Sequence, residues 1–451
     1  MTVFSIIQKS QLEGAHRLDA EYYQPEYLTL QKNIDSTDSA KLWSEIDGKF
    51  ITGPFGSEFN TENYIPDGEY RYMRGKDVKD FFLTDDDNVY IPDEDYARLK
   101  KYSLSEGDIL ISVVGTPGIA SIVDKNVVPA IFSCKSTAFR TKAIDTCYLL
   151  AYLNSKYGRT FLARSIRGAL QTGLNIDDLK NLPIFVPKQH NQEIVASFVK
   201  NAKEQLDLSK SLYSQAENML LEELGLKDFR AEEDLFSIVS LSDIKSAHRM
   251  DAEYFQSEWG KLKGKLGKTE KLGNLATLQK GFEPGSEQYQ EEGKLFIRVS
   301  SISKDGITDK DQKYLSDELY KNLKKDFEPK VGEILLTKDA TPGAAYAIKE
   351  PIEGIIAGGV LRLKPKGIEP EYLALCINSL VGQAQVNRDA GGSIIAHWKP
   401  AQIKNLIVPV LPETTQDKIS DLVRKSHEAH KKSKELLEEA KRKVEEMIER
   451  Q

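Results

Sequence analysis

Thirteen polar or basic side chains of this sequence occur in stretches with turn residues or at the ends of predicted helices. Arginine, lysine, asparagine and glutamine donate hydrogen bonds to base edges, and arginine and lysine also neutralise phosphates. The candidates for such contacts are Ser57, Arg74, Lys76, Arg164, Arg167, Gln171, Asn175, Arg298, Ser300, Lys338, Arg388, Ser393 and His397. These residue types can contact nucleic acid, although the composition of the chain alone does not suggest that function.

One segment has the features of an element that enters a DNA groove. Arg167-Gly-Ala-Leu-Gln-Thr-Gly173 is a glycine-flanked loop that follows a basic helix, and Ala390–His397 is its counterpart later in the chain. For each candidate the alternative is a solvated surface charge or a residue that shapes its loop. Arg74 and Arg298 flank apolar residues, so buried structural pairing is a further alternative for both.

Patterns of several catalytic sites are missing from the sequence. No Asn/Asp-Pro-Pro-Phe/Tyr run is present to hold a flipped base for amino-methylation. Gly264-Lys-Leu-Gly-Lys-Thr269 differs from a phosphate-binding loop in its spacing and has no strand before it. The six histidines form no HExxH motif or metal-ligand cluster. Cys134, Cys147 and Cys376 are widely spaced and form no CxxC pair, so we expect buried, reduced thiols.

The net charge of −7 is unusual for a protein that binds DNA, because lysine and arginine must neutralise phosphates. The charge is unevenly distributed, and its distribution matters more than its sum. Residues 134–167 contain seven basic residues and one acidic residue, Asp145. The acidic stretches Asp85–Asp87 and Asp93–Asp95 are expected to face away from DNA.

An internal repeat organises the whole chain. Nine of thirteen positions are identical between Ala15–Tyr27 and Ala247–Trp259. Further matched pairs follow in the same order over about 220 residues of each half. They are Phe4-Ser-Ile with Phe236-Ser-Ile, Gly107-Asp-Ile-Leu-Ile-Ser with Gly332-Glu-Ile-Leu-Leu-Thr, Thr116-Pro-Gly with Thr341-Pro-Gly, Asn154-Ser with Asn378-Ser, and Leu179-Lys-Asn-Leu with Ile403-Lys-Asn-Leu. The chain therefore contains a duplication.

Each half has the same order of predicted elements. Strand-like runs with turn residues come first, followed by a helical stretch at 148–162 or 372–386 and a strand that ends on proline. Each half then ends in a long helix, predicted at 192–224 and 416–450, with no interior proline or glycine. Gly225 is a C-cap glycine that ends the first helix.

The two long helices have matching apolar seams. The first consists of Val195, Phe198, Ala202, Leu212, Ala216 and Met219, and the second of Ile419, Leu422, Ala429, Leu436, Ala440 and Met447. Gln205, Ser209, Ser426, Ser433 and Lys443 interrupt them. A helix of about 33 residues is roughly 50 Å long, which exceeds the wall of a small domain. The seams predict an antiparallel coiled coil; the alternative is that each helix packs separately on its own domain.

The predicted fold class is α+β. Two repeated mixed α/β domains are joined by two long helices that form an antiparallel coiled coil, with approximate two-fold symmetry. The predicted boundaries are 1–190 for an N-terminal segment and first domain, 191–228 for the central helix, 229–412 for a linker segment and second domain, and 413–451 for the C-terminal helix. Neither a signal peptide nor a membrane span is evident, so we expect a cytoplasmic protein.

This organisation resembles the specificity subunit of type I restriction-modification systems. The resemblance covers essentially the whole chain and rests on the order of its motifs. The most family-like segments are Arg17-Leu-Asp-Ala-Glu-Tyr-Tyr, Gly53-Pro-Phe-Gly-Ser57, Tyr72-Met-Arg-Gly-Lys-Asp-Val78, Gly107-Asp-Ile-Leu-Ile-Ser and Leu179–Pro187. The second half departs at the glycine loop, where Gly281-Phe-Glu-Pro-Gly-Ser286 replaces the first form.

The resemblance implies two target-recognition domains, each of which reads one half of a split, asymmetric DNA target, with the helix pair setting the unread gap. It implies that two methyltransferase subunits dock on the helices and N-terminal segments, and that translocating restriction subunits join them. It also implies that S-adenosylmethionine, ATP and magnesium belong to those partners and that this chain itself holds no cofactor, no metal and no catalytic site.

Two other functions compete with this interpretation. A protein-interaction scaffold would use the repeats to bind protein only, and DNA binding by the isolated chain would exclude it. An enzyme with an unfamiliar one-sided site is less favoured, because no nucleophile–base or metal constellation occurs in both halves. The sequence predicts neither the target bases nor the gap length.

Overall fold

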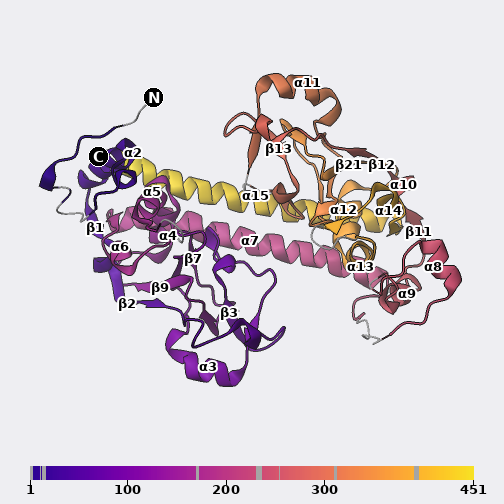
Figure 1. Cartoon of the computed structure of the whole chain (residues 1–451), viewed down its shortest axis with the longest axis horizontal. Helices are drawn as coiled ribbons and strands as arrows, with labels where there is room; N and C mark the ends of the chain where they lie inside the picture. Colours follow the sequence, from indigo (N-terminus) through magenta and orange to yellow (C-terminus); the bar gives the residue numbers. More distant parts are fainter. Residues whose placement is uncertain are drawn as a thin grey trace. The chain divides into compact units, whose positions relative to one another are not determined.

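The computed structural model describes residues 4–10, 12, 17–168, 172–229, 236–252, 254–308, 312–390 and 396–450 (Figure 1). The chain forms two compact units. Unit 1 comprises Met1–Glu204 and Lys432–Gln451, and unit 2 comprises Gln205–Lys431. Both unit boundaries fall inside the long helices, so each unit contains one copy of the repeat and a part of each long helix. The four segments given by the sequence stay a prediction.

Unit 1 has a mixed α/β recognition region between short N-terminal helices and the first long helix. Its elements are η1 (Ala20–Tyr23), α2 (Pro25–Asp35), β1 (Ser39–Lys41), η2 (Leu42–Glu45), β2 (Ile46–Thr52), η3 (Thr61–Asn63), β3 (Tyr70–Met73), η4 (Gly75–Asp77), β4 (Phe81–Phe82), β5 (Tyr90–Ile91), α3 (Asp93–Leu99), η5 (Lys100–Tyr102), β6 (Ile109–Ser112), β7 (Ala120–Ile122), β8 (Ala130–Phe132), β9 (Ser136–Thr141), α4 (Thr146–Asn154), α5 (Lys156–Ser165), α6 (Ile176–Lys180), β10 (Pro183–Phe185) and α7 (Gln189–Glu223). They form sheets in the orders β2-β9-β6-β7-β4, β5-β3-β8 and β1-β10.

Unit 2 repeats this plan. Its elements are α8 (Leu241–Ala247), α9 (Ser257–Lys263), β11 (Thr269–Lys271), α10 (Leu272–Leu275), β12 (Ala276–Lys280), η6 (Ser286–Gln288), β13 (Lys294–Ile297), η7 (Val299–Ser301), β14 (Ile302–Ser303), β15 (Gly306–Ile307), β16 (Lys313–Leu315), α11 (Asp317–Phe327), β17 (Ile334–Thr337), β18 (Asp339–Ala340), β19 (Ala345–Ala347), β20 (Gly354–Ile356), β21 (Val360–Pro365), α12 (Pro370–Asn378), α13 (Leu380–Asp389), β22 (Ala396–His397), α14 (Pro400–Lys404), β23 (Ile407–Pro409) and α15 (Glu413–Glu449). Its sheets run β12-β21-β17-β19, β16-β13-β20, β11-β23, β14-β15 and β18-β22.

The same pairings recur at matched positions. In unit 1 the edge strand β2 pairs with β9 from Ile46 with Thr141, and in unit 2 the edge strand β12 pairs with β21 from Ala276 with Pro365. The small three-stranded sheet of each unit contains one parallel pair, β3 with β8 or β13 with β20. The fold class given by the sequence is confirmed in these repeated α+β units, whereas the approximate two-fold relation between them stays a prediction.

One helical prediction is wrong in both halves. Each predicted helix is two helices, α4 with α5 and α12 with α13, and the break lies at Ser155 or Ser379. A Cβ at Gly158 would lie 2.2 Å from the carbonyl oxygen of Tyr152, and one at Gly382 would lie 2.1 Å from that of Ile377. The glycine therefore permits the close turn between the two helices, and the serine begins the second helix.

The long helices pair as an antiparallel coiled coil, as the seams predict. In unit 1 the start of α7 packs on the end of α15, through Val195 and Val199 beside Ala440 and Val444. In unit 2 the end of α7 packs in one core with the start of α15, to which Ile419 belongs.

In α7, at every second position of the predicted seam, the buried side chain belongs to the residue that follows the predicted one. The buried residues along the seam of α7 are Val195, Val199, Ala202, Ser209, Tyr213, Ala216 and Leu220, and the expected Phe198, Leu212 and Met219 are half-buried beside them. At each of these places two adjacent residues are apolar or aromatic, so the helical pattern alone does not specify which of the two is buried. The serines that interrupt the seams are buried: Ser426 Oγ donates to Ser209 O at 2.8 Å, and Ser433 Oγ donates to Ala202 O at 2.7 Å.

Both helices begin three residues before the predicted position, at Gln189 and Glu413. Among the described residues, no helix combines the length and the apolar character that crossing a membrane requires. The three cysteines carry no disulfide; Cys376 is buried, and Cys134 and Cys147 are half-buried. Burial raises the pKa of Cys147 to about 11 and that of Cys376 to about 12, so both thiols are protonated near neutral pH.

Candidate nucleic-acid interface

Four loops of each unit gather beside the parallel strand pair of its small sheet. In unit 1 these are residues 53–57, 74–77, 113–118 and 133–135, named here the unit 1 loop cluster. The unit 2 loop cluster comprises residues 281–285, 298–301, 338–343 and 357–359. Parallel strands end at the same edge of a sheet, so the loops after β3 and β8, or after β13 and β20, are neighbours.

Backbone hydrogen bonds fix the unit 1 loop cluster. Ser133 N donates to Met73 O at 2.9 Å, and Val113 N donates to Lys135 O at 2.8 Å. The Cα of Gly53 lies so close to the 132–133 backbone that a Cβ there would be 2.2 Å from Phe132 O. A side chain at this position is excluded, which explains the glycine that opens the loop.

Equivalent bonds fix the unit 2 loop cluster. Ala357 N donates to Ile297 O at 2.8 Å, and Lys338 N donates to Gly359 O at 3.0 Å. A Cβ at Gly281 would lie 2.3 Å from Ala357 O, so Gly281 takes the place of Gly53. The sequence alone aligned the two glycine loops only approximately. The shared close approach to the backbone now aligns Gly281 with Gly53.

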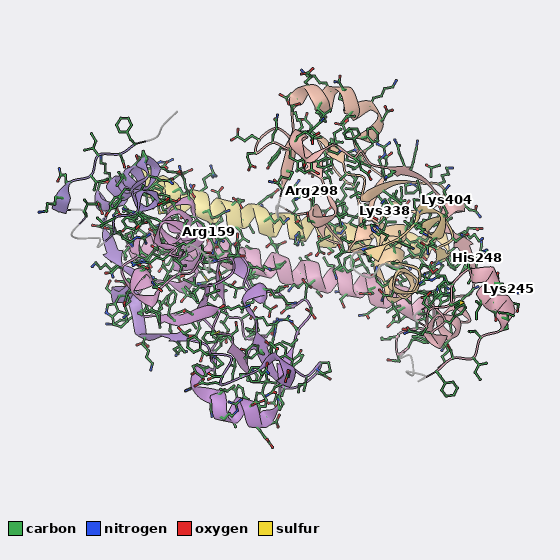
Figure 2. The ribbon with its side chains drawn as sticks, viewed as in Figure 1. Arg159, Lys245, His248, Arg298, Lys338 and Lys404 are labelled. Carbon is green, nitrogen blue, oxygen red and sulfur yellow. The ribbon has the colours of Figure 1, made fainter. Side chains whose placement is uncertain are left out.

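The Thr-Pro-Gly turns are held in the same way in both copies. Ser112 Oγ donates to Thr116 O at 2.6 Å, and Thr337 Oγ1 donates to Thr341 O at 2.7 Å. A side chain from the following helix reaches the glycine of each turn. Arg159, labelled in Figure 2, donates from Nη1 to Gly118 O at 2.6 Å, and Gln383 Nε2 donates to Gly343 O at 3.0 Å.

Three sequence candidates lie in the unit 1 loop cluster. Ser57 is exposed in the glycine loop, and the Lys76 ammonium group lies 2.5 Å from Asp87 Oδ2. Arg74 is largely buried: its Nε and Nη2 each lie 3.0 Å from a carboxylate oxygen of Asp77. The hydrogen bond to Asp77 raises the pKa of Arg74, despite the opposing effect of burial. The structural pairing considered for Arg74 is therefore present.

Four candidates lie in or beside the unit 2 loop cluster. Arg298 and Ser300 line a cavity, described below, and Arg298 and Lys338 are labelled in Figure 2. Lys338 is buried and forms an ion pair with Asp339, whose other oxygen is 2.8 Å from His397 Nδ1. Burial acts to raise the pKa of Asp339, but hydrogen bonds from Lys338 and His397 outweigh it and lower that pKa.

Arg164 and Arg388 lie elsewhere, in a repeated Arg–Tyr–Arg stack that ties the N-terminal segment of each unit to a helix. In unit 1 the Tyr22 ring has Arg17 Cζ at 4.7 Å and Arg164 Cζ at 3.9 Å from its centroid. Arg17 also donates to Asp19 at 2.7 Å, and Arg164 Nε donates to Tyr22 O at 2.9 Å. These contacts use the repeated Arg-Leu-Asp-Ala-Glu-Tyr segment.

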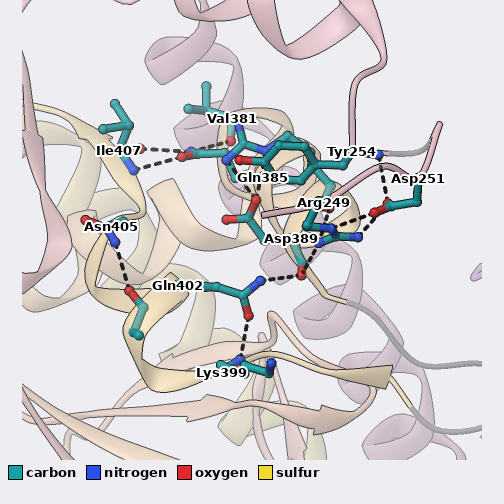
Figure 3. Close-up of polar contacts among 12 residues, drawn as sticks. Arg249, Asp251, Tyr254, Val381, Gln385, Asp389, Lys399, Gln402, Asn405 and Ile407 are labelled. Carbon is teal, nitrogen blue, oxygen red and sulfur yellow. Dashed lines mark hydrogen bonds and ion pairs between the residues drawn. The ribbon is translucent and has the colours of Figure 1, made fainter. Parts of the chain in front are cut away.

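In unit 2 the Tyr254 ring has Arg249 Cζ at 4.8 Å and Arg388 Cζ at 4.9 Å from its centroid. Figure 3 shows Arg249 bound to Asp251 and to Asp389 O, the latter at 3.0 Å. Gln402 donates to the same carbonyl at 2.8 Å (Figure 3). The stack explains the duplicated motif as a structural anchor, and a DNA-contacting role for Arg164 and Arg388 stays a prediction.

The remaining candidates lie on the segment predicted to enter a groove. Arg167 makes a bidentate pair with Asp178, at 2.6 Å and 2.9 Å, and Asn175 is exposed just before α6. Leu174 N donates to Val113 O at 3.0 Å, which joins this segment to the unit 1 loop cluster. Gln171 and Ser393 lie outside the described residues.

Aromatic residues of the loop clusters were not among the sequence candidates. Phe55 is 64% exposed between the two glycines of its loop, and Phe282 and Tyr289 line the unit 2 cavity. The sequence signal that could have identified Phe55 as exposed is its position between two loop glycines. Aromatic rings also contact bases and sugars, so both loop clusters combine the residue types that bind nucleic acid.

Comparison with known proteins identifies a family domain in one part of the chain. Residues 55–218 match the model of the type I restriction modification DNA specificity domain, and no curated protein sequence matches the chain. The S subunit of a type I restriction-modification system from M. genitalium is similar at 16% identity, covering 91% of this chain and 94% of that chain, with a TM-score of 0.41.

The HsdS subunit from Thermoanaerobacter tengcongensis is similar at 14% identity, covering 90% of this chain and 95% of that chain, with a TM-score of 0.29. Both TM-scores are below 0.5, and the assignment rests on the match to the family model. The resemblance seen in the sequence is confirmed over residues 55–218, which match the type I restriction modification DNA specificity domain.

Proposed function

We propose that this chain is the DNA-specificity subunit of a type I restriction-modification complex, in which unit 1 reads one half of a split target and unit 2 reads the other. The observation that carries the proposal is the specificity domain at residues 55–218, whose loop cluster is built a second time in unit 2. The two clusters share their backbone bonds and differ in their side chains. Two readers of this kind specify an asymmetric target.

The two methyltransferase subunits are proposed to dock on repeated apolar surfaces. Each N-terminal segment exposes three large apolar side chains at positions 232 residues apart: Phe4, Ile6 and Leu18 in unit 1, and Phe236, Ile238 and Met250 in unit 2. Two equivalent surfaces fit two copies of one partner. Phe4→Ser is expected to reduce the methyltransferase bound per chain from two copies to one, and Phe4→Ser with Phe236→Ser to none, measured by native mass spectrometry.

Catalysis and its cofactors are proposed to reside on the partners. S-adenosylmethionine would belong to the methyltransferase subunits, and ATP and magnesium to the restriction subunits. This chain would then supply recognition and assembly and would carry out no bond-making step.

The direct test is co-expression with a type I methyltransferase subunit from the same locus, followed by single-molecule sequencing of modified bases. Methylation at one split, asymmetric motif supports the proposal and gives the target. A stable complex without methylation would contradict it and favour the scaffold function. Absence of any complex would contradict the docking of a methyltransferase partner.

The helix pair is proposed to set the gap between the half-sites. Insertion or deletion of matched turns in α7 and α15 is expected to change the gap and to leave the bases of both half-sites unchanged. A changed base preference with an unchanged gap would exclude the spacer role.

A further inference from the structure

The unit 2 loop cluster encloses an open cavity of about 730 Å³. Phe282 and Tyr289 form an aromatic wall, and the Tyr289 ring packs on Phe296 with centroids 5.5 Å apart. The polar lining comes from Arg298, Ser300, Thr341 and Glu283, whose carboxylate is paired with Lys280 at 2.7 Å. The cavity thus combines apolar walls with a few polar groups, as ligand sites do.

The backbone at the rim of this cavity is strained. Ala340 has a φ of 59°, a left-handed conformation that costs a residue with a Cβ about 1–2 kcal/mol. The matched residue of unit 1 is Gly115, with a φ of 91°. Unit 2 therefore retains the turn that presents Thr341 without the glycine that adopts it freely. Strain of this kind concentrates at binding sites.

The matched arginine of unit 1 is held differently. Arg74 is the equivalent of Arg298, and Asp77 accepts hydrogen bonds from its Nε, its Nη2 and its backbone N. The residue at the position of Asp77 in unit 2 is Ser301, which is buried and carries no charge. Lys76 corresponds to Ser300 in the same comparison. The duplication has kept the arginine and exchanged both of its neighbours.

We propose that Arg298 and Ser300 are specificity-determining residues of unit 2, and that Arg298 reads one guanine of its half-site, whereas Arg74 serves the unit 1 fold. Arginine pairs with guanine O6 and N7 through two parallel hydrogen bonds, which is the commonest specific base contact of this side chain. Ser300 is exposed beside it and can donate to a neighbouring base. The aromatic wall gives the approaching base an apolar surface. The inference rests on the proposed function and adds the residues and the base.

The test uses the full chain co-expressed with its methyltransferase subunit, with sequencing of modified bases. Arg298→Gln is expected to change one position of the unit 2 half-site from guanine towards adenine, because glutamine pairs with adenine N6 and N7. The preference for guanine there should fall by about tenfold to a hundredfold. Ser300→Ala is expected to relax one adjacent position, and Lys325→Gln, an exposed cation on α11, serves as the control for loss of charge.

The unit 1 arm tests the difference between the copies. Arg74→Gln is expected to lower the stability of unit 1 and to leave the bases of its half-site unchanged. A changed base in that half-site would overturn the assignment of Arg74 as a structural residue.

Failure of the inference is distinguishable from failure of the proposed function. If the wild-type complex methylates no split motif, the proposed function fails. If it does so and Arg298→Gln methylates the same motif with the same base preferences, the inference is overturned. If Arg298→Gln abolishes methylation, binding to oligonucleotides with each base at each position decides. Binding restored by adenine at one position supports the inference, and equal loss on all sequences overturns it.

Discussion

At one matched position, the contact between a long helix and its domain is an ion pair in unit 1 and a pair of basic residues in unit 2. In unit 1, Lys203 of α7 lies 2.5 Å from Asp124, and this pair joins the helix to the recognition region. The matched residues of unit 2 are His427 on α15 and Lys349, two basic groups in place of an ion pair. His427 Nε2 donates to Lys304 O at 3.0 Å, and its ring lies beside Tyr346, with centroids 5.3 Å apart.

The charge states differ accordingly. Burial, with the nearby charge of Lys349, lowers the pKa of His427 to about 4, and burial lowers the pKa of Lys349 to about 8. In unit 1, burial acts to raise the pKa of Asp124, but the hydrogen bond and charge of Lys203 outweigh it and lower that pKa. The duplication has kept the contact between helix and domain and changed the interaction that makes it.

The loop clusters also keep their backbone contacts and exchange particular side chains. Their backbone hydrogen bonds match, whereas Asp77 is replaced by Ser301 and Gly115 by Ala340. Positions that agree between the copies specify the scaffold, and positions that differ specify what is particular to each unit. Matched substitutions in the two copies can test this division directly.

The largest expected contrast is between Asp77→Ala and Ser301→Ala. Loss of Asp77 removes three hydrogen bonds from Arg74 and leaves it with Asp87, an exposed carboxylate 3.4 Å from its Nη1, which is expected to cost about 2 kcal/mol of unit 1 stability. Ser301 Oγ is buried and makes no hydrogen bond to the described residues, so its removal should change unit 2 stability by less than about 0.5 kcal/mol. Hydrogen exchange in each unit measures both, and equal costs would contradict the contrast.

The next contrast concerns acid. A histidine whose folded pKa is below its unfolded pKa of 6.5 stabilises the fold at higher pH, and this stability is lost as the pH falls from 6.5 through 4. Between pH 7 and pH 5 unit 2 is expected to lose about 2 kcal/mol. Asp124 contributes its stability above its unfolded pKa of 3.8 and loses it only below that, so this position costs unit 1 nothing in the same range.

The double variant His427→Lys with Lys349→Asp recreates the unit 1 pair in unit 2. It is expected to remove most of the loss between pH 7 and pH 5 in hydrogen exchange of unit 2. His427→Gln is the matched control, because it removes the titrating group without adding a charge pair. An unchanged loss of stability in both variants would show that other groups cause the acid sensitivity.

The smallest effects come from the Thr-Pro-Gly turns. Gly115→Ala places a Cβ in a left-handed conformation and is expected to destabilise unit 1 by about 1–2 kcal/mol. Ala340→Gly relieves the same strain, but glycine adds freedom to the unfolded chain, so a gain of only about 0.5 kcal/mol is expected. Thermal unfolding of the two variants gives the sign of each change in stability. Destabilisation by Ala340→Gly would contradict the strain at this residue.

Much of the architecture followed from the sequence because the repeat supplied it twice. The matched motifs gave two α+β units, and the proline-free seams gave the paired helices. The sequence did not predict the breaks at Ser155 and Ser379, because their apolar pattern continues across the turn. The choice between Phe198 and Val199 in the seam depends on the partner helix, which a single helix pattern does not specify.

The candidate site was predictable in outline only. The sequence identified three of the four loops in each cluster and missed residues 133–135 and 357–359. The partners of basic residues depend on contacts between distant segments. Arg164 meets Tyr22 across more than a hundred residues of chain, and Lys338 is buried against its neighbour Asp339. Exposed loop arginines and buried structural arginines have the same local pattern, so only the fold separates them.

Each unit is proposed to read one half of a split target independently of the other. The most direct measurement is a chain in which residues 276–365, from β12 to β21, are replaced by residues 46–141, from β2 to β9, co-expressed with the methyltransferase subunit and sequenced for modified bases. Two copies of the unit 1 half-site in opposite orientation are predicted in place of the asymmetric motif. Methylation of the original asymmetric motif by this chain would contradict the claim.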